Sequence, residues 1–204
     1  MTRLALLAAL AAFALPASGQ HHGGHSGSHS EAAPGVAEAF VVDGLRVDEA
    51  APPPGSGVGR AGLRFDDGGY VSVVYGKPYK RGRTVFGGLV GYDLVWATGA
   101  HQSTELWTTV PLTVGSTRIE PGGYSLFTTP GADGWTIHLN RRLGMHLADE
   151  YDPEEDVAVV EAAPAALPEA VEALTYTFVT EDSLGLRIAW DRTAVTLPFT
   201  RADP

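Results

Sequence analysis

From Gly62 to Phe199, apolar and polar residues alternate in short runs that Gly and Pro separate. The run from Leu184 to Trp190 shows this best, because every second residue is large and apolar and falls on one face of an extended segment. The 204 residues include 25 Gly and 14 Pro, which suits short strands and turns better than long helices. The pattern predicts an all-β, antiparallel protein, either a sandwich or an open barrel.

Turn signals divide this region into about nine or ten short strands. The residues Asp66–Gly69 lie between two alternating runs, which is a strong hairpin signal. A short alternation within 36–47 predicts a peripheral strand. Residues 164–174 suit a short helix that Pro168 begins or, as we prefer, a loop that leads into a strand. The other expected strands are 105–110, 112–119 as a hairpin about Gly115 and Ser116, 123–129, 135–140, 171–180, 184–190 and 194–199.

The six residues from Ile119 to Tyr124, with sequence IEPGGY, match the pattern of a tyrosine corner. In such a corner the ring packs over a turn, and the hydroxyl bonds the backbone upstream, which pins a crossover between two sheets. We therefore assign Tyr124 a structural role. The motif favours a Greek-key β-sandwich over a meander barrel.

Residues 1–19 have the pattern of a signal peptide. Arg3 precedes a run of twelve apolar residues, 4–15, and small residues follow at 17–19. The run is too short to span a membrane, and no Cys follows it that could carry a lipid anchor. We expect export to the periplasm or beyond, a flexible tether rich in His, Gly, Ser and Pro over 20–59, and a single sandwich domain over 60–200.

Composition disfavours several classes of function. The chain has 24 Asp and Glu against 14 Lys and Arg, whereas nucleic-acid binding needs a basic face. Cys is absent, which excludes disulfides, a thiol nucleophile and thiolate metal sites. The Gly-x-Ser-x-Gly motif of many serine hydrolases is also absent. The sequence favours a non-catalytic module that binds a small molecule, another protein or the cell envelope.

Several motifs occur in a specific order: YGKP at 75–78, RGR at 81–83, FGGLV at 86–90, TGA at 98–100 and PGGYSLFT at 121–128. In this order they resemble domain-of-unknown-function family 2911, secreted bacterial proteins with no established activity, over about 60–200. The resemblance implies structural roles for Gly87, Gly88 and Trp96. The chain departs from the family pattern where it has Ala97 in place of Arg, His101 in place of Asn, and Met-His-Leu at 145–147 in place of Gln-Trp-Gly.

The candidate ligand surface lies between Arg81 and Glu105. Arg81 and Arg83 belong to the chain's basic cluster at 77–83, and a guanidinium suits a carboxylate or phosphate ligand. The alternative is that these charges pair with the acidic surface and hold the Gly-rich turn. Thr98, His101, Gln102 and Glu105 belong to a polar segment at the start of a strand, where loops often carry function. Alternatively, His101 is only a polar loop residue.

Metal chemistry gives further hypotheses. His101, His138 or His146 with a carboxylate would suit zinc in a metal-dependent hydrolase. Residues 149–156 contain six carboxylates, which suit calcium, although the usual loop spacing with its central Gly is missing and a solvated loop is the alternative. Trp107 is expected to be either exposed, as in sugar-binding sheets, or packed in the core.

The segment QHHGGHSGSHS at 20–30 carries the four histidines His21, His22, His25 and His29. Such tracts can bind copper or zinc, and periplasmic handling of these metals is therefore another hypothesis. A soluble tether with incidental histidines is the alternative.

The metal-handling hypothesis predicts that the mature protein binds Cu(II) through this tract. The intact mass fixes the cleavage point, and a copper titration compares the mature protein with a variant that lacks residues 20–30. Binding that disappears with the tract supports metal handling, and equal binding by both proteins contradicts it.

Overall fold

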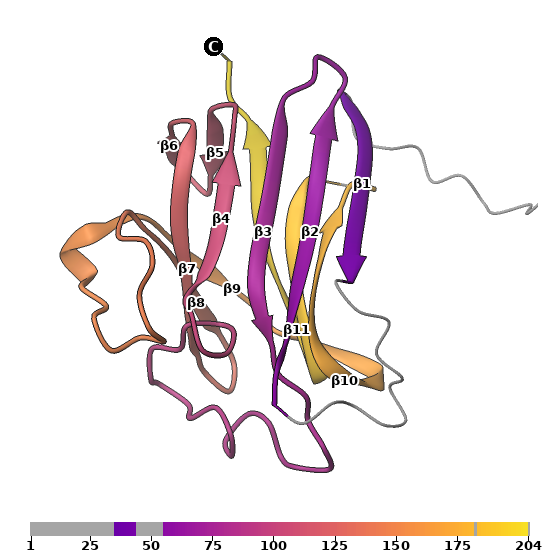
Figure 1. Cartoon of the computed structure of the whole chain (residues 1–204), viewed down its shortest axis with the longest axis vertical. Helices are drawn as coiled ribbons and strands as arrows, with labels where there is room; N and C mark the ends of the chain where they lie inside the picture. The colour runs from indigo at the N-terminus through magenta and orange to yellow at the C-terminus, as the bar shows by residue number, and fades with distance from the viewer. Residues whose placement is uncertain (1–34, 44–54, 182, 204) are drawn as a thin grey trace, which may run out of the picture. The chain divides into compact units, whose positions relative to one another are not determined.

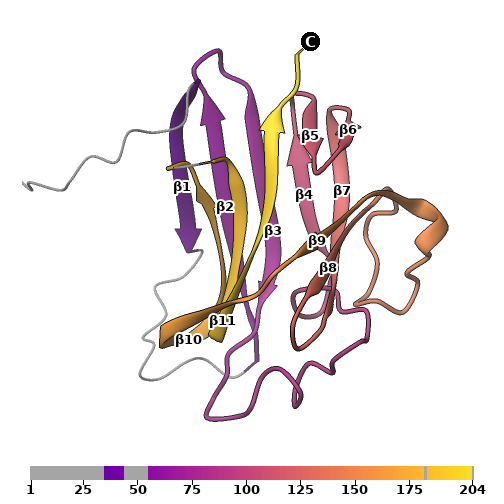
Figure 2. The ribbon, with the colours of Figure 1, turned by 180° about the vertical axis from the view of Figure 1, so that it is seen from behind.

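The computed structural model describes residues 35–43, 55–181 and 183–203. These residues form an all-β, sandwich-like structure of two antiparallel sheets (Figures 1 and 2), as the alternating pattern predicts. The seven-stranded sheet has the order β1 (Val36–Asp43), β2 (Gly57–Phe65), β3 (Tyr70–Lys77), β4 (Thr104–Thr108), β7 (Gly122–Pro130), β8 (Trp135–Asn140) and β9 (Asp156–Ala162). The four-stranded sheet has the order β10 (Ala165–Val179), β11 (Gly185–Arg201), β5 (Leu112–Val114) and β6 (Thr117–Ile119).

The described ranges contain no α-helix and no helix long and apolar enough to cross a membrane. One 3-10 turn, η1 (Pro153–Glu155), precedes β9. The expected peripheral strand is present as β1, at one edge of the larger sheet within the segment 20–59. The proposed signal peptide and the four N-terminal histidines lie outside the described residues.

The core lies between the sheets because alternate side chains of each strand point inward. In β3, Val71, Val73 and Tyr75 are buried, and they pair in register with the buried alternation of β2. Tyr75 contacts Tyr176 of β10 across the core, with ring centroids 4.4 Å apart. The predicted hairpin about residues 66–69 joins β2 to β3.

The second sheet differs from the expected arrangement. Residues 171–180, 184–190 and 194–199 were expected as three strands, whereas the structure has only two, β10 and β11. The sequence from Asp191 to Thr193 suggested a turn, but Asp191 takes a φ of 51° and pairs with Val171 at a register shift. The register shift is a β-bulge, and β11 continues through it as one strand. β10 begins at Ala165, so neither the helix considered at 164–174 nor the preferred loop is present there, and the strand starts earlier than the expected residue 171.

Tyr124 lies where the chain crosses between the sheets. β6 belongs to the four-stranded sheet and β7 to the seven-stranded sheet. The Tyr124 hydroxyl donates a hydrogen bond of 2.7 Å to the carbonyl of Glu120, on the connection between these strands. The bond fixes the direction in which the chain leaves one sheet and enters the other.

We expect Tyr124→Phe to lower the free energy of unfolding by about 1 kcal/mol, because the change removes one hydrogen bond and keeps the ring. Urea unfolding measures the difference. The control is Tyr92→Phe, since Tyr92 is an exposed tyrosine in the loop between β3 and β4. Removing its hydroxyl should lower the free energy of unfolding by less than about 0.5 kcal/mol. Equal stability of Tyr124→Phe and the wild type would contradict a pinning role.

Candidate functional site

A cavity of about 310 Å³ lies on the outer face of the larger sheet, over β2, β3 and β4. Val58 and Val74 form its apolar floor, because they alternate with the core residues of their strands and point away from the core. His101, Gln102 and Glu105 also line it, and Glu105 pairs in register with Val74. Three of the six candidate binding residues thus meet at one cavity.

The wall at residues 98–103 is held by close backbone packing against β3. A Cβ on Gly76 would lie 1.9 Å from the carbonyl oxygen of Ala100, so only glycine allows this approach. The carbonyl of Thr98 accepts hydrogen bonds from the hydroxyls of Tyr176, at 2.7 Å, and Thr104, at 3.0 Å. The loop is therefore anchored to both sheets.

Thr98 is fully buried, and its hydroxyl bonds the hydroxyl of Thr128 at 3.0 Å. Its side chain is therefore part of the packing and not of the cavity lining. Thr98 and His101 have φ values of 50° and 69°, in the left-handed region that most residues avoid. The loop holds this strained shape through the contacts of its backbone.

Residues 141–152 do not line the cavity but are bonded to residues that do. The backbone N–H of Ser103 donates to Met145 at 2.8 Å, and that of Leu147 donates to His101 at 3.0 Å. Beneath this segment, Ala97, Phe127 and Met145 form a small apolar cluster separate from the main core. The segment is thus bonded directly to the residues that line the cavity.

Glu105 joins the cavity to an exposed tryptophan. One carboxylate oxygen accepts the backbone N–H of Gly144 at 3.1 Å, and the other accepts the indole N–H of Trp107 at 3.2 Å. Trp107 is 44% exposed and lies against Gly123 of β7. Of the two expectations for Trp107, the exposed one matches the structure.

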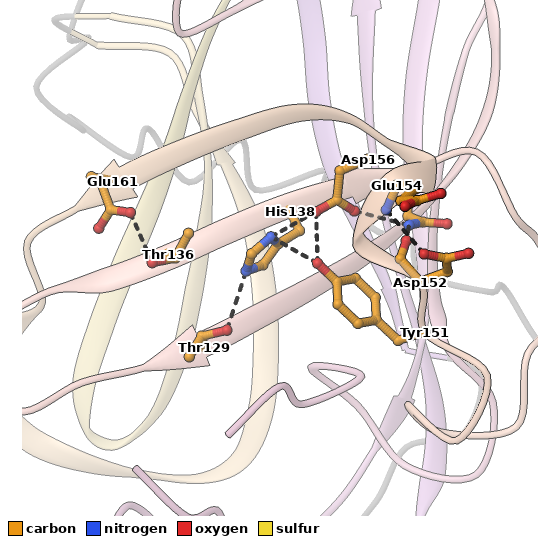
Figure 3. A network of polar contacts seen from close by, with 9 residues as sticks. Thr129, Thr136, His138, Tyr151, Asp152, Glu154, Asp156 and Glu161 are labelled. Atoms are coloured by element: carbon orange, nitrogen blue, oxygen red, sulfur yellow. Dashed lines mark hydrogen bonds and ion pairs between the residues drawn. The ribbon is translucent and has the colours of Figure 1, made fainter. Parts of the chain in front are cut away.

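A polar network lies on the same outer face but outside the cavity lining (Figure 3). One oxygen of the Asp156 carboxylate accepts the Tyr151 hydroxyl at 2.6 Å and lies 2.9 Å from Nδ1 of His138, and the other accepts the Asn140 amide at 2.8 Å. Nε2 of His138 lies 3.1 Å from the hydroxyl of Thr129. Both ring nitrogens are therefore engaged, and the network ties the segment before β9 to the sheet.

The network also affects the ionisation of Tyr151. Burial raises the pKa of the Tyr151 hydroxyl above its ordinary value of 10.0, and the hydrogen bond to Asp156 raises the pKa further. Both effects favour the protonated hydroxyl, because ionisation would place a second negative charge beside the carboxylate.

The arginines of the candidate set do not line the cavity. The guanidinium of Arg83 donates to the carbonyls of Tyr79 and Lys80, at 2.8 and 3.0 Å, and so holds the turn. The Arg81 guanidinium lies 5.5 Å from the centre of the Tyr79 ring and donates to a backbone carbonyl. Lys80 forms an ion pair with Asp191. These contacts match the alternative in which the basic cluster stabilises its own loop.

The glycines and the tryptophan of the loop before β4 serve packing. Gly87 has a φ of 77°, and a Cβ on Gly88 would lie 2.5 Å from the carbonyl oxygen of Thr84. The Trp96 ring stacks on Trp190, with centroids 5.9 Å apart, and its backbone pairs with Thr128 of β7. The loop is thereby fixed at both sheets.

Within the described ranges, no group of three or more His, Asp or Glu side chains is placed to hold a metal ion. The three histidines of the hydrolase hypothesis belong to no such group, although His101 and His146 lie on adjacent segments, and several carboxylates of 149–156 pair with different side chains. The pairs are His146 with Asp149, Arg142 with Glu150, Arg141 with Glu155, and His138 with Asp156. The structure thus gives no support to the zinc or calcium hypotheses for these residues.

Sequence reasoning missed the cavity floor and the network. Val58 lay in the expected tether at 20–59, and Val74 looked like any strand residue. Their alternation with core residues could have indicated that they lie on the outer face of the sheet. Tyr151 and Asp156 were read only as part of an acidic loop. Nothing in the spacing of His138, Tyr151 and Asp156 indicates that they meet.

A family model described as "Protein of unknown function (DUF2911)" matches residues 63–199, a range that runs from β2 into β11 and covers both sheets. No curated protein and no solved structure matches the chain.

We expect the free energy of unfolding to fall as the pH rises above 10, because the unfolded chain then releases the Tyr151 proton while the folded protein retains it. In Tyr151→Phe this part of the pH dependence should be lost, and the variant should be less stable than the wild type at pH 8, with the difference shrinking above pH 10. Urea unfolding from about pH 8 to pH 11 measures both effects. Identical slopes above pH 10 in the two proteins would contradict the raised pKa.

Proposed function

The chain belongs to the family described as "Protein of unknown function (DUF2911)", and on this premise we propose that it is an exported, non-catalytic protein that binds a small molecule. The binding site is the cavity over β2, β3 and β4. The observation that carries the proposal is the convergence of His101, Gln102 and Glu105 at the rim of a cavity with an apolar floor. Small-molecule sites are usually lined by apolar side chains, with a few polar groups at defined positions that orient the ligand.

The surroundings of the cavity favour binding over catalysis. Ser103, the hydroxyl residue of the lining nearest to His101 in sequence, is buried, and its hydroxyl lies 3.2 Å from that of Ser125. The Thr129–His138–Asp156 arrangement lies outside the lining of this cavity. A nucleophile beside a base at the cavity would be needed for covalent catalysis.

The charge of the lining limits the ligand. Among the described residues that line the cavity there is neither Lys nor Arg, and Glu105 contributes a carboxylate. Anionic ligands are therefore disfavoured, because no cation compensates their charge and Glu105 repels them. A neutral polar ligand or a cation suits the lining.

Export is the second part of the proposal. It is supported by residues 1–19, which have the charged start, apolar run and small residues of a signal peptide. The chain's acidic composition and lack of Cys suit a soluble protein that does not depend on disulfides.

The proposal predicts that filling the cavity abolishes ligand binding. Val74→Trp places a large ring on the floor at an exposed position, so the sandwich should still fold. A thermal-shift screen of the mature protein compares neutral sugars, amines, carboxylates, phosphates and divalent metals. We expect at least one class of neutral or cationic compound to raise the melting temperature of the wild type and not that of Val74→Trp.

The matched control is Val159→Trp, the same substitution at an exposed position on β9 of the same sheet. It should retain the shift. The cavity proposal fails if no compound raises the melting temperature of the wild type, or if Val74→Trp responds as strongly as Val159→Trp.

A further inference from the structure

We propose that the ligand is a saccharide, stacked on the exposed face of Trp107 and hydrogen-bonded by Glu105, Gln102 and His101. This inference rests on the proposed function, since it names the ligand class of the same cavity. It depends on Trp107, which does not line the cavity but adjoins it through Glu105.

The first observation is the position of the indole ring. A Cβ on Gly123 would lie 2.9 Å from each of three atoms of the six-membered ring of Trp107. Three equal distances mean that the ring presents its face, and not its edge, to the backbone of β7. Because Gly123 and Trp107 are direct partners in the β4–β7 ladder, the ring lies flat on the sheet. With 44% of the residue exposed, the opposite face of the ring is open to solvent.

A flat indole of this kind fits the chemistry of a sugar ring. The face of an aromatic ring carries partial negative charge, and it attracts groups with partial positive charge. One face of many pyranose rings presents several C–H groups of that kind, while the hydroxyls point outward around the ring. A glycine opposite the ring is needed, since any side chain at residue 123 would lift the indole off the sheet.

The second observation is the fixed carboxylate beside the ring. Glu105 accepts the Trp107 indole N–H and the Gly144 backbone N–H, one on each oxygen. Each oxygen of a carboxylate has two acceptor sites, so one on each oxygen is still available to a ligand hydroxyl. The side chain is held in place before a ligand arrives, which lowers the entropy cost of binding.

The remaining polar groups match a ligand rich in hydroxyls. The Gln102 amide offers both donors and an acceptor, and the His101 imidazole offers one of each when neutral. Hydroxyl groups also donate and accept, so they satisfy groups of both kinds. The Val58 and Val74 floor suits the apolar face of a second sugar unit.

A quaternary ammonium cation is the competing ligand, since a carboxylate beside a tryptophan face also attracts such cations. Two features favour the saccharide. A quaternary ammonium group has no hydrogen-bonding groups for Gln102 and His101, and a single tryptophan leaves most of such a cation without aromatic contact. The test therefore includes both ligand classes.

The experiment titrates the mature protein with neutral oligosaccharides of glucose, mannose, galactose and N-acetylglucosamine, and with tetramethylammonium. Calorimetry and Trp fluorescence report binding. We expect at least one oligosaccharide to bind, and Trp107→Ala to weaken its binding about threefold to tenfold. Trp107→Phe should restore part of the loss, because it keeps an aromatic face. The control is Leu94→Ala, which removes an exposed apolar side chain outside the cavity and should bind as the wild type does.

Glu105→Gln separates the two ligand classes. It keeps an acceptor oxygen for a hydroxyl but removes the charge that an ammonium group needs. Saccharide binding that survives this change in weakened form supports the proposal. Binding of tetramethylammonium alone, lost in Glu105→Gln, overturns the saccharide assignment and leaves the cavity function standing. Saccharide binding that Trp107→Ala leaves unchanged also overturns it, and an absence of binding by every compound in the screen removes both proposals.

Discussion

The contact between the backbones of Gly76 and Ala100 determines where the candidate site forms. Because residue 76 has no side chain, the end of the long loop before β4 can lie directly on β3. The buried carbonyl of Thr98 then reaches the Tyr176 hydroxyl, which comes from the other sheet through the core. His101 is thereby brought to the cavity over the outer face. A sheet whose outer face would otherwise be open to water acquires a wall on one side through this single approach.

Much of the fold follows from local pattern, and the site follows from it only in part. The alternation about Val73 and Ile188 reports which face of a strand is buried, so the strands and the hairpin at 66–69 were predictable. The continuation of β11 through Asp191 was not, because a bulge and a turn have similar local sequences. The positive charge of Arg83 suggested a contact with an anionic ligand, but its guanidinium donates hydrogen bonds to carbonyls of its own turn. Contacts between segments distant in the sequence, such as those of His138 with Asp156, leave no local pattern at all.

The departures from the family pattern become understandable in three dimensions. Ala97 and Met145, where the resemblance implies Arg and Gln, belong to one apolar cluster. His101 and Leu147 stand where the pattern has Asn and Gly, and their φ values are 69° and 52°. Asn and Gly adopt such angles most readily. Both residues adopt a left-handed backbone, and His101 also lines the cavity.

The pairing of β11 with β5 affects the order in which the molecule can be completed. Phe199 pairs with Val114, and Thr200 with Thr113, so the smaller sheet is joined by residues far apart in the sequence. Contacts of this range slow folding, because a long stretch of chain must be ordered before they form. During synthesis, β11 emerges after all the other described strands. The smaller sheet therefore stays incomplete until β11 is made, and a product truncated before β11 would leave β10 and β5 without their shared partner.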